Sequence, residues 1–300
     1  MRILFYPVKL IIVLISFLPF SVIYLLSDLL YLVLYKIAGY RLAVVRSNLK
    51  KAFPDAGAEF LKQTEKNFYH NLCDVIAEFL KMPSITARQL ERRVTFTNPE
   101  LLEQFSHQGR SVIGVGSHMC NWEWGGLAVS HKFHGYECLG VYKPLSNVSF
   151  DGWFKKLRSR FGMHMIPMKG TLRAVASRRD QPLLLNLIAD QTPTLSETEY
   201  EPLFLGIPTP VFLGAEKIAA AADMPVLYFT MRRTKRGFYS VTLLPITEHP
   251  KTETGHSITD KHLALLEKEI LHQPGNWLWS HRRWKHSGKF SHRATQENKV

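Results

Sequence analysis

The pattern of hydrophobic and polar positions divides the chain into an apolar start, a helical segment and a region of alternating elements. Residues 41–94 carry apolar side chains at roughly helical spacing, with a break at Pro54, and are predicted to be helical. Beyond them, short apolar runs typical of strands alternate with helical patterns. The predicted strands are Ser111–Val115, Glu137–Tyr142, His164–Met168, Leu183–Ile188, Val226–Met231 and Tyr239–Leu244. The predicted helices are Asp151–Arg160, Leu172–Arg179, Gly214–Ala222 and His262–His272.

Alternation of strands and helices predicts an α/β fold with a mixed, mostly parallel sheet flanked by helices. We expect an antiparallel hairpin near Val226–Leu244. No repeat or low-complexity tract interrupts this region. We therefore divide the chain into an N-terminal membrane anchor (1–40), one globular domain (41–290) and a basic mobile tail (291–300).

The apolar start of the chain allows three interpretations. Leu10–Ser27 has no charged residue, Asp28 interrupts, and Leu29–Tyr35 continues apolar, so the segment is long enough to span a bilayer as a helix. A single span is the favoured interpretation. The second is a broken helix in one leaflet, kinked at Pro19 with Asp28 reaching water. A signal peptide is the weakest, because no small-x-small cleavage site follows the apolar run.

Charges around this segment indicate its orientation. Two basic residues precede the apolar run and five follow it, and the more basic side of a span belongs in the cytoplasm. The flanking residues are Arg2 and Lys9, then Lys36, Arg41, Arg46, Lys50 and Lys51. The sequence therefore predicts a membrane-anchored protein with its globular domain on the cytoplasmic side.

Composition narrows the class of protein. With 46% apolar and 21% charged residues, the chain is neither disordered, collagen-like nor a polytopic membrane protein. Its three cysteines, Cys73, Cys120 and Cys138, are too few for a disulfide framework. The formal net charge of +13 predicts a partner rich in negative charge, such as nucleic acid, anionic lipid or an acidic protein.

Candidate chemistry follows the first predicted strand of the alternating region. Gly114-Val115-Gly116 lacks the third glycine of a dinucleotide-binding loop, because Met119 stands there. His118 and Glu123 are five residues apart, and they meet only if His118 lies in the loop and Glu123 in the first turn of a helix capped by Asn121. Such a pair would be a general base oriented by an acid. The structural alternative is a loop histidine and a helix-start acid without chemistry.

Two other binding classes are poorly supported. His131, His134 and Cys138 have loose metal-ligand spacing, but no second pair completes a site. The basic C-terminal segment could bind nucleic acid, yet beside a membrane anchor it fits anionic lipid head groups better. That segment carries Arg282, Arg283, Lys285, Lys289, Arg293 and Lys299. We expect neither a metal nor nucleic acid.

An ordered set of motifs resembles the lipid A late acyltransferase family (lauroyl and myristoyl acyltransferases) within the lysophospholipid and glycerolipid acyltransferase superfamily. It begins with Arg46–Pro54 and His118-x4-Glu123, and covers most of residues 1–285 in the family's order. The other matching segments are Tyr142–Asn147, Arg158–Gly162, Ala189–Gln191, Pro202–Gly206, and Pro274 with Trp277–Lys285. The resemblance implies a glycerolipid-acyltransferase-like fold and an enzyme that moves a fatty acyl chain from acyl carrier protein to a hydroxyl of a lipid A precursor.

The resemblance also implies roles for individual residues. His118 would deprotonate the acceptor hydroxyl, with Glu123 orienting it, and Asp190 would stand near the base or fix an arginine. The oxyanion would meet Arg158, Arg160 or the backbone N–H groups near Asn121. Four arginines are candidates for acceptor phosphates or lipid head groups: Arg232, Arg233, Arg282 and Arg283.

One residue departs from the family, which usually has glycine at the position of Cys120. A thiol nucleophile there is disfavoured, because the resemblance implies direct transfer from the thioester; the turn after His118 is expected to differ instead. No cofactor is expected; acyl carrier protein is the co-substrate, and a coenzyme A thioester is the alternative. Other acceptors (a lysophospholipid, an aminolipid or another glycolipid) stay open, as does a non-catalytic lipid-binding protein.

Overall fold

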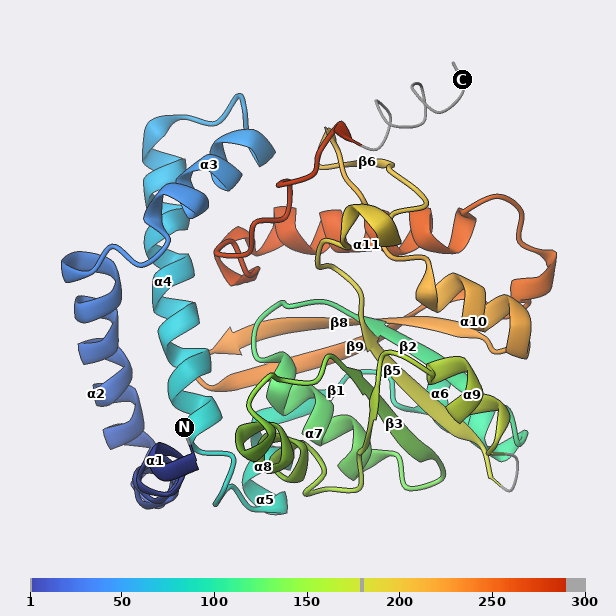
Figure 1. The fold of residues 1–300 in the computed structure, drawn as a ribbon, viewed down its shortest axis with the longest axis horizontal. Helices are drawn as coiled ribbons and strands as arrows, with labels where there is room; N and C mark the ends of the chain where they lie inside the picture. The colour runs from blue at the N-terminus through green and yellow to red at the C-terminus, as the bar shows by residue number, and fades with distance from the viewer. Residues whose placement is uncertain (1, 179–180, 290–300) are drawn as a thin grey trace.

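A seven-stranded sheet forms the centre of the molecule (Figure 1). The computed structural model describes residues 2–178 and 181–289 of the chain. Strand order is β1-β9-β8-β2-β5-β3-β4, and a separate pair, β6-β7, lies outside the sheet. The strands are β1 (Val94–Phe96), β2 (Val112–Gly116), β3 (Glu137–Tyr142), β4 (His164–Pro167), β5 (Leu183–Ile188), β6 (Leu203–Phe204), β7 (Ile207–Pro208), β8 (Val226–Lys235) and β9 (Phe238–Thr247).

Five neighbouring strands of the sheet, β8, β2, β5, β3 and β4, run parallel, so their carboxyl ends share one edge. β9 pairs antiparallel with β8, and β1 pairs parallel with β9. The predicted mixed, mostly parallel sheet and the hairpin near Val226–Leu244 are therefore confirmed. A ligand site in such a sheet is expected at the shared carboxyl edge.

Helices cover both faces of the sheet, with α10 and α11 on one side and α7 and α8 on the other (Figure 1). The α-helices are α1 (Arg2–Ser16), α2 (Phe20–Tyr31), α3 (Leu42–Ala52), α4 (Ala58–Leu80), α5 (Ala87–Arg93), α6 (Glu100–His107), α7 (Trp122–Lys132), α8 (Val148–Arg158), α9 (Thr171–Ala176), α10 (Gly214–Ala222) and α11 (Ser257–His272). A π-helix, η1 (Leu32–Ile37), and three 3₁₀ turns, η2 (Leu195–Glu197), η3 (Pro250–Thr252) and η4 (Pro274–Asn276), complete the described elements.

Each face of the sheet has its own hydrophobic core because strand side chains alternate between the faces. Leu183 and Leu185 pack on the side of α11, with Leu266 and Ile270. Leu184, between them in sequence, packs on the opposite side with Trp124 and other residues of α7. Both cores are closed by helices, as expected for a parallel sheet.

The N-terminal helices lie on the flank of the molecule that faces the carboxyl edge of the sheet (Figure 1). Phe20–Ile37, which joins α2 and η1, is the one described segment long and apolar enough to cross a membrane, judged by length and composition alone. α2 packs along α4, and α1 ends before Pro19, where the chain turns.

Most predicted elements are found with end shifts of a few residues. The strand predictions for β3 and β5 and the helix prediction for α10 match the structure at both ends. β8 and β9 each extend beyond the predicted runs, and the hydrophobic pattern missed β1 and the β6-β7 pair, which are two or three residues long. Arg179, at the end of one predicted helix, and the predicted tail 291–300 lie outside the described residues.

Candidate active site

The register of two neighbouring strands brings together a histidine and an aspartate from distant parts of the sequence. β2 and β5 are parallel, with Gly116 opposite Ile188. His118 and Asp190 each follow those residues by two positions, so both side chains emerge at the carboxyl edge of the sheet. The backbone N–H of Ala189 donates to the carbonyl of Gly116, which continues the ladder into the loops.

Asp190 is a buried hydrogen-bond acceptor for His118 and for a tryptophan near the C-terminus. Its Oδ1 lies 2.6 Å from His118 Nδ1, and its Oδ2 accepts from the His118 backbone N–H at 2.9 Å and from Trp277 Nε1 at 2.8 Å. Burial alone would raise the pKa of Asp190, but the charge and hydrogen bonds of His118, with Trp277, hold that pKa well below its usual range. Asp190 is therefore an ionised acceptor that fixes the Nδ1–H tautomer of His118.

The other ring nitrogen of His118 contacts Gln191. With the proton on Nδ1, Nε2 carries a lone pair, and it accepts a hydrogen bond of 3.1 Å from the side-chain amide of Gln191. The side chain of His118 is 16% exposed, whereas that of Asp190 is 2% exposed. The Trp122 ring packs edge-on against the imidazole, with 4.9 Å between the two ring centroids. This is the geometry of a general base held by a buried carboxylate.

The expectation that Glu123 orients His118 is wrong in this structure. Glu123 lies in the first turn of α7, as predicted, but its carboxylate forms a two-pronged ion pair with Arg158, with distances of 2.8 Å to Nε and 2.5 Å to Nη2. Strand register places Asp190 beside the imidazole. Asp190 therefore has the first of the two roles weighed for it, standing near the base. Glu123 has the second, fixing an arginine. Glu123 and Arg158 are a second polar unit next to the loop of His118.

The two candidate oxyanion arginines have different surroundings. Arg158, at the C-terminal end of α8, uses Nε and Nη2 for Glu123, which leaves Nη1 for other partners. Burial would lower the pKa of Arg158, but its hydrogen bonds to Glu123 outweigh this and raise it. Arg160 donates instead to the backbone carbonyl of Met82. The structure therefore favours Arg158 over Arg160.

The loop between His118 and α7 contains a strained turn at Cys120. Its φ of +50° lies in the left-handed region, which favours glycine and explains the glycine expected at this position. The Cys120 thiol is fully buried and donates to the carbonyl of Met231 at 3.1 Å, and burial raises the pKa of this thiol well above its usual value. Such a cysteine is a poor nucleophile.

Residues near the C-terminus hold the same loop. The N–H of Cys120 donates to the carbonyl of Asn276 at 2.9 Å, and Met119 forms an antiparallel bridge with Trp277. Trp277 also donates to Asp190. The loop after β2, the loop after β5 and η4 thus form one connected unit around the imidazole.

A buried carboxylate that the sequence did not indicate connects α4 to the start of α7. Asn121 caps α7 as predicted, since its Oδ1 accepts from the N–H of Trp124 at 2.9 Å. Its Nδ2 donates at 2.6 Å to Glu78, which also accepts from Tyr24 and Tyr239. Burial raises the pKa of Glu78, and these three donors oppose the rise. Spacing could not reveal Glu78, because it lies 43 residues from Asn121.

The four arginines predicted to bind phosphates or head groups do not form one set. Arg232 and Arg282 are exposed, so they remain candidates. Arg233 is neutralised by Asp74, with Nη2 2.5 Å from Oδ2. Arg283 is buried, donates to the Pro210 carbonyl at 2.7 Å, and has its pKa lowered by burial to about 10. The expectation that Arg283 meets a head group at the surface is wrong, because it connects the C-terminal segment to the interior.

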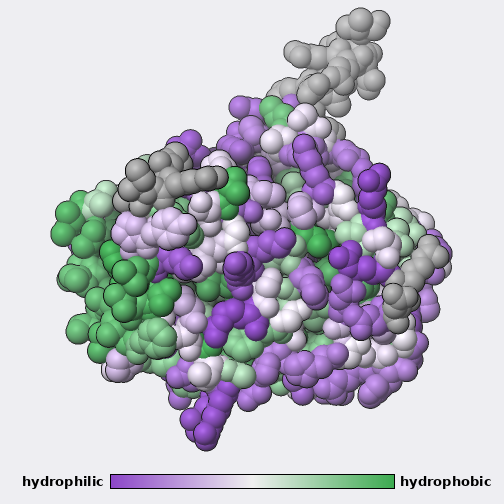
Figure 2. Space-filling model, turned by 60° about the horizontal axis from the view of Figure 1, so that its bottom comes forward, coloured by the Kyte–Doolittle hydropathy of each residue, from purple (hydrophilic) through white to green (hydrophobic). Residues whose placement is uncertain are grey.

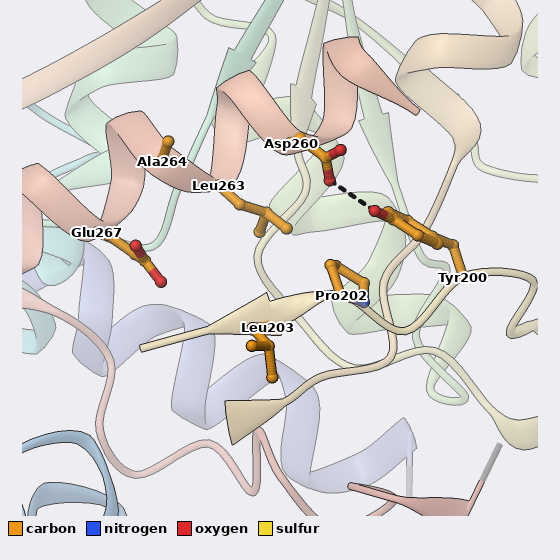
Figure 3. Close-up of a pocket in the computed structure, with 7 residues that line it drawn as sticks. All are labelled: Tyr200, Pro202, Leu203, Asp260, Leu263, Ala264 and Glu267. Atoms are coloured by element: carbon orange, nitrogen blue, oxygen red, sulfur yellow. Dashed lines mark hydrogen bonds between the residues drawn. The ribbon is translucent and has the colours of Figure 1, made fainter. Parts of the chain in front are cut away.

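Two hollows lie outside the His118 unit. Figure 3 shows the first, about 310 Å³ between α11 and the segment that leads into β6, with the Tyr200 hydroxyl donating to Asp260. Its lining residues are Tyr200, Pro202, Leu203, Asp260, Leu263, Ala264 and Glu267. The second, about 620 Å³, is bounded by α4, the β8-β9 turn and η4. Neither includes His118 or Asp190.

Fold and site together define a class of protein: an α/β protein with a histidine–carboxylate pair suited to general-base chemistry, beside an apolar N-terminal surface. Comparison with known families agrees with the motifs and narrows this class. Residues 2–286 match the family model described as bacterial lipid A biosynthesis acyltransferase. The chain therefore belongs to the lipid A biosynthesis acyltransferase family, and the resemblance seen in the sequence is confirmed.

Curated relatives of this chain are themselves lipid A enzymes. The chain is 25% identical over 274 residues to the lipid A biosynthesis lauroyltransferase of Escherichia coli K12, covering 89% of this chain and 87% of that enzyme. It is 22% identical over 246 residues to the lipid A biosynthesis palmitoleoyltransferase of the same organism, covering 82% of this chain and 79% of that enzyme. A lipid A biosynthesis acyltransferase of Shigella flexneri matches to the same extent.

Proposed function

We propose that this protein transfers a fatty acyl chain from the thioester of acyl carrier protein to a hydroxyl of a lipid A precursor. The family supports lipid A acyl transfer, and the donor and the hydroxyl acceptor are our proposal. The observation that carries it is the 2.6 Å contact between His118 Nδ1 and Asp190. It leaves the Nε2 lone pair of His118 available to an acceptor hydroxyl, which would replace the Gln191 amide.

In the proposed reaction His118 moves one proton twice. Nε2 takes the proton of the acceptor hydroxyl while its oxygen attacks the thioester carbonyl carbon, and Asp190 stabilises the imidazolium. When the tetrahedral intermediate collapses, the carbon–sulfur bond breaks and Nε2 returns the proton to the leaving thiolate. The products are an ester on the acceptor and a free thiol on the donor. Neither a metal ion nor a covalent enzyme intermediate takes part in this proposal.

The negative charge on the carbonyl oxygen needs a positioned donor. Arg158 is our candidate, because Glu123 fixes its guanidinium plane at two points and leaves Nη1 without a hydrogen-bond partner among the described residues. Fixing a donor before the reaction lowers the cost of reorganisation in the transition state. In this proposal Glu123 acts through Arg158, and Asp190 acts through His118.

Charge at the carboxyl edge of the sheet supports an acidic donor protein. Lys143 follows β3 and Lys169 follows β4, and both are exposed on the edge that carries His118. Neither belongs to an ion pair among the described residues. Leu145, 45% exposed, and Met168, 39% exposed, add apolar contact area beside them. With the net charge of +13, this edge would attract acyl carrier protein more strongly than a neutral donor. We place the protein on the inner membrane with this edge on the cytoplasmic side.

The proposal is tested by supplying purified protein with a lipid A precursor and acyl carrier protein loaded with a fatty acid. We expect the precursor to gain the mass of one ester-linked acyl chain, and His118→Ala to abolish the gain. Loss of one acyl chain from lipid A in a strain without the gene would be the matching cellular result. If a lysophospholipid or aminolipid gains the chain instead, the acceptor is wrong. If no lipid is acylated by any thioester, the protein is not the proposed enzyme.

A further inference from the structure

A continuous apolar surface covers the outer side of the N-terminal helices. The large side chains there are exposed far beyond what a soluble surface needs, for example Phe17 at 72%, Leu25 at 67% and Ile37 at 79%. The others are Tyr6, Leu10, Ile11, Leu14, Leu29, Leu32, Val33 and Tyr40. Figure 2 shows the largest hydrophobic area of that view on one flank of the molecule.

The opposite side of α2 is attached to α4 by polar contacts. Tyr24 donates to Glu78 at 2.8 Å, Ser27 donates to Asp74 at 2.6 Å, and Asp28 pairs with Arg236 of the β8-β9 turn at 2.6 Å. Further along, Tyr35 donates to Glu65 at 2.8 Å. Positions 24, 27, 28 and 35 share one helical face, and the exposed positions 25, 29, 32 and 33 share the other.

α4 is 23 residues long and α2 packs along it. The polar contacts between the two helices therefore also fix how α2 meets a membrane. If α2 and η1 crossed a bilayer, α4 would enter with them, carrying buried Glu65, Asp74 and Glu78. Asp28 would stand near the middle of the 18-residue segment. A charged residue at that depth is energetically unfavourable. Crossing therefore requires α2 to leave the body and break these contacts.

The arrangement of α1 supports a different attachment. In Figure 1, α1 is seen end-on while α2 runs from top to bottom on the same flank. Both helix axes therefore run along that flank rather than out of it. The Lys81 side chain holds the turn between the two helices, donating at 2.7 Å to the carbonyl of Leu18.

We propose that α1, α2 and η1 lie together in one leaflet of an anionic membrane, and that α2 does not cross it. The apolar side chains would enter about 5–10 Å, to the boundary of head groups and acyl chains. Basic residues that flank these helices in the sequence match anionic head groups. They are Lys9, Lys36, Arg41, Lys50 and Lys51. The consequence is that the start of the chain and the globular body lie on the same side of the membrane. This inference does not depend on the reaction proposed above.

Labelling from one side of the membrane tests this consequence. A hydrophilic epitope with one cysteine is placed before Met1, and a second protein carries Lys217→Cys on exposed α10. The three native cysteines are buried, so background labelling by an impermeant maleimide is low in the folded protein. In sealed vesicles of known orientation we expect both cysteines to react from the same side. Reaction from opposite sides would overturn the proposal. Unchanged protease resistance and melting establish that each protein is folded.

Depth measurements provide a second test that does not depend on the epitope. Nitroxides are attached to cysteines at Leu25, Leu29 and Ile37, all exposed, in vesicles containing anionic lipid. A crossing helix would change depth by roughly 18 Å between positions 25 and 37, at 1.5 Å per residue. We expect all three labels in one leaflet, with depths differing by less than about 6 Å. Depths that follow the rise of the helix would overturn the proposal. Full release of the protein by high salt would also overturn it. Spin–spin coupling that persists on dilution with lipid would do the same, because a second copy of the protein would then cover the surface.

Discussion

Replacing Asp190 by asparagine removes one negative charge beside His118 and keeps the side-chain volume. Asp190 now accepts three hydrogen bonds, from the His118 backbone, His118 Nδ1 and Trp277 Nε1. An asparagine has one oxygen to accept them. The orientation that keeps two of the three bonds places this oxygen toward the His118 backbone and Trp277, and its NH₂ group toward His118 Nδ1.

In that orientation the asparagine donates to Nδ1, so the imidazole proton moves to Nε2. The lone pair that would accept the hydroxyl proton is then lost, although the ring stays in place. Loss of general-base catalysis typically lowers a rate by about 10²–10⁴-fold, equivalent to about 3–5 kcal/mol in the transition state. We expect kcat for acyl transfer to fall in this range, while KM for donor and acceptor changes by less than about threefold.

The assay measures kcat and KM in mixed micelles, and a ¹⁵N spectrum of labelled histidine reports the tautomer of His118. A purely structural role for Asp190 would lower the melting temperature without moving the proton from Nδ1 to Nε2. A folded Asp190→Asn protein with kcat within fivefold of the wild type would refute the assignment of Asp190 as the positioning residue of the base.

Three further predictions concern the turn at Cys120, the Arg158 guanidinium and a buried carboxylate of α11. Cys120→Gly should keep activity and change the free energy of unfolding by less than about 1 kcal/mol, because relief of the left-handed φ offsets the lost thiol packing. Cys120→Val should lower the free energy of unfolding by at least about 2 kcal/mol, and denaturant unfolding compares the two variants. Arg158→Lys should lower kcat at least tenfold, because one ammonium replaces a two-point contact with Glu123. Steady-state kinetics measures this with Arg160→Lys as the control, and equal kcat values for the two variants would contradict it. Glu269 of α11 is buried and accepts hydrogen bonds from the Thr230 hydroxyl and the backbone N–H of Met231 on β8. Burial raises the pKa of Glu269 to about 6, so its stabilising contribution is present below the unfolded pKa of 4.5 and is lost as pH rises through 6. Relative to Glu269→Gln, the wild type should lose about 2 kcal/mol between pH 4 and pH 7, and an unchanged difference would exclude this titration.

Hydrophobic periodicity predicted the fold well because each central strand is buried on both faces. Runs such as Leu183–Ile188 are apolar over nearly their whole length, and such runs mark parallel strands strongly. β1 has three residues and the β6-β7 pair has two residues in each strand, too short for periodicity to detect.

The structure brings together several candidate residues selected from the sequence, but not in the predicted pairs. His118, Glu123, Asp190 and Arg158 were all selected, yet Glu123 was assigned to His118 because the two are close in sequence. The actual partner depends on β5 lying next to β2, which no local pattern encodes. The available signal was a polar residue two positions beyond the end of each of two strands. The missing information was the order of the strands in the sheet.

Cys120 illustrates a further limit of local patterns. The departure from glycine was visible in the sequence, and the expected consequence was a different turn. In the structure the cysteine adopts the conformation that glycine favours, with φ of +50°, and its thiol fits a closed space next to Met231. The backbone keeps the turn because η4 holds it from the other side through the carbonyl of Asn276. Tertiary contacts therefore override the residue's own preference.

The central claim is that His118 and Asp190 act as one unit and that Glu123 belongs to another. A double-mutant cycle measures this most directly, with kcat/KM for acyl transfer determined for His118→Ala, Asp190→Asn, Glu123→Gln and the two doubles that include His118→Ala. If Asp190 acts only through His118, adding Asp190→Asn to His118→Ala should lower kcat/KM by less than about threefold, while adding Glu123→Gln should lower it by nearly its full single-mutant effect. The reverse pattern, in which Glu123→Gln has no further effect and Asp190→Asn has its full effect, would contradict the account and return the orienting role to Glu123.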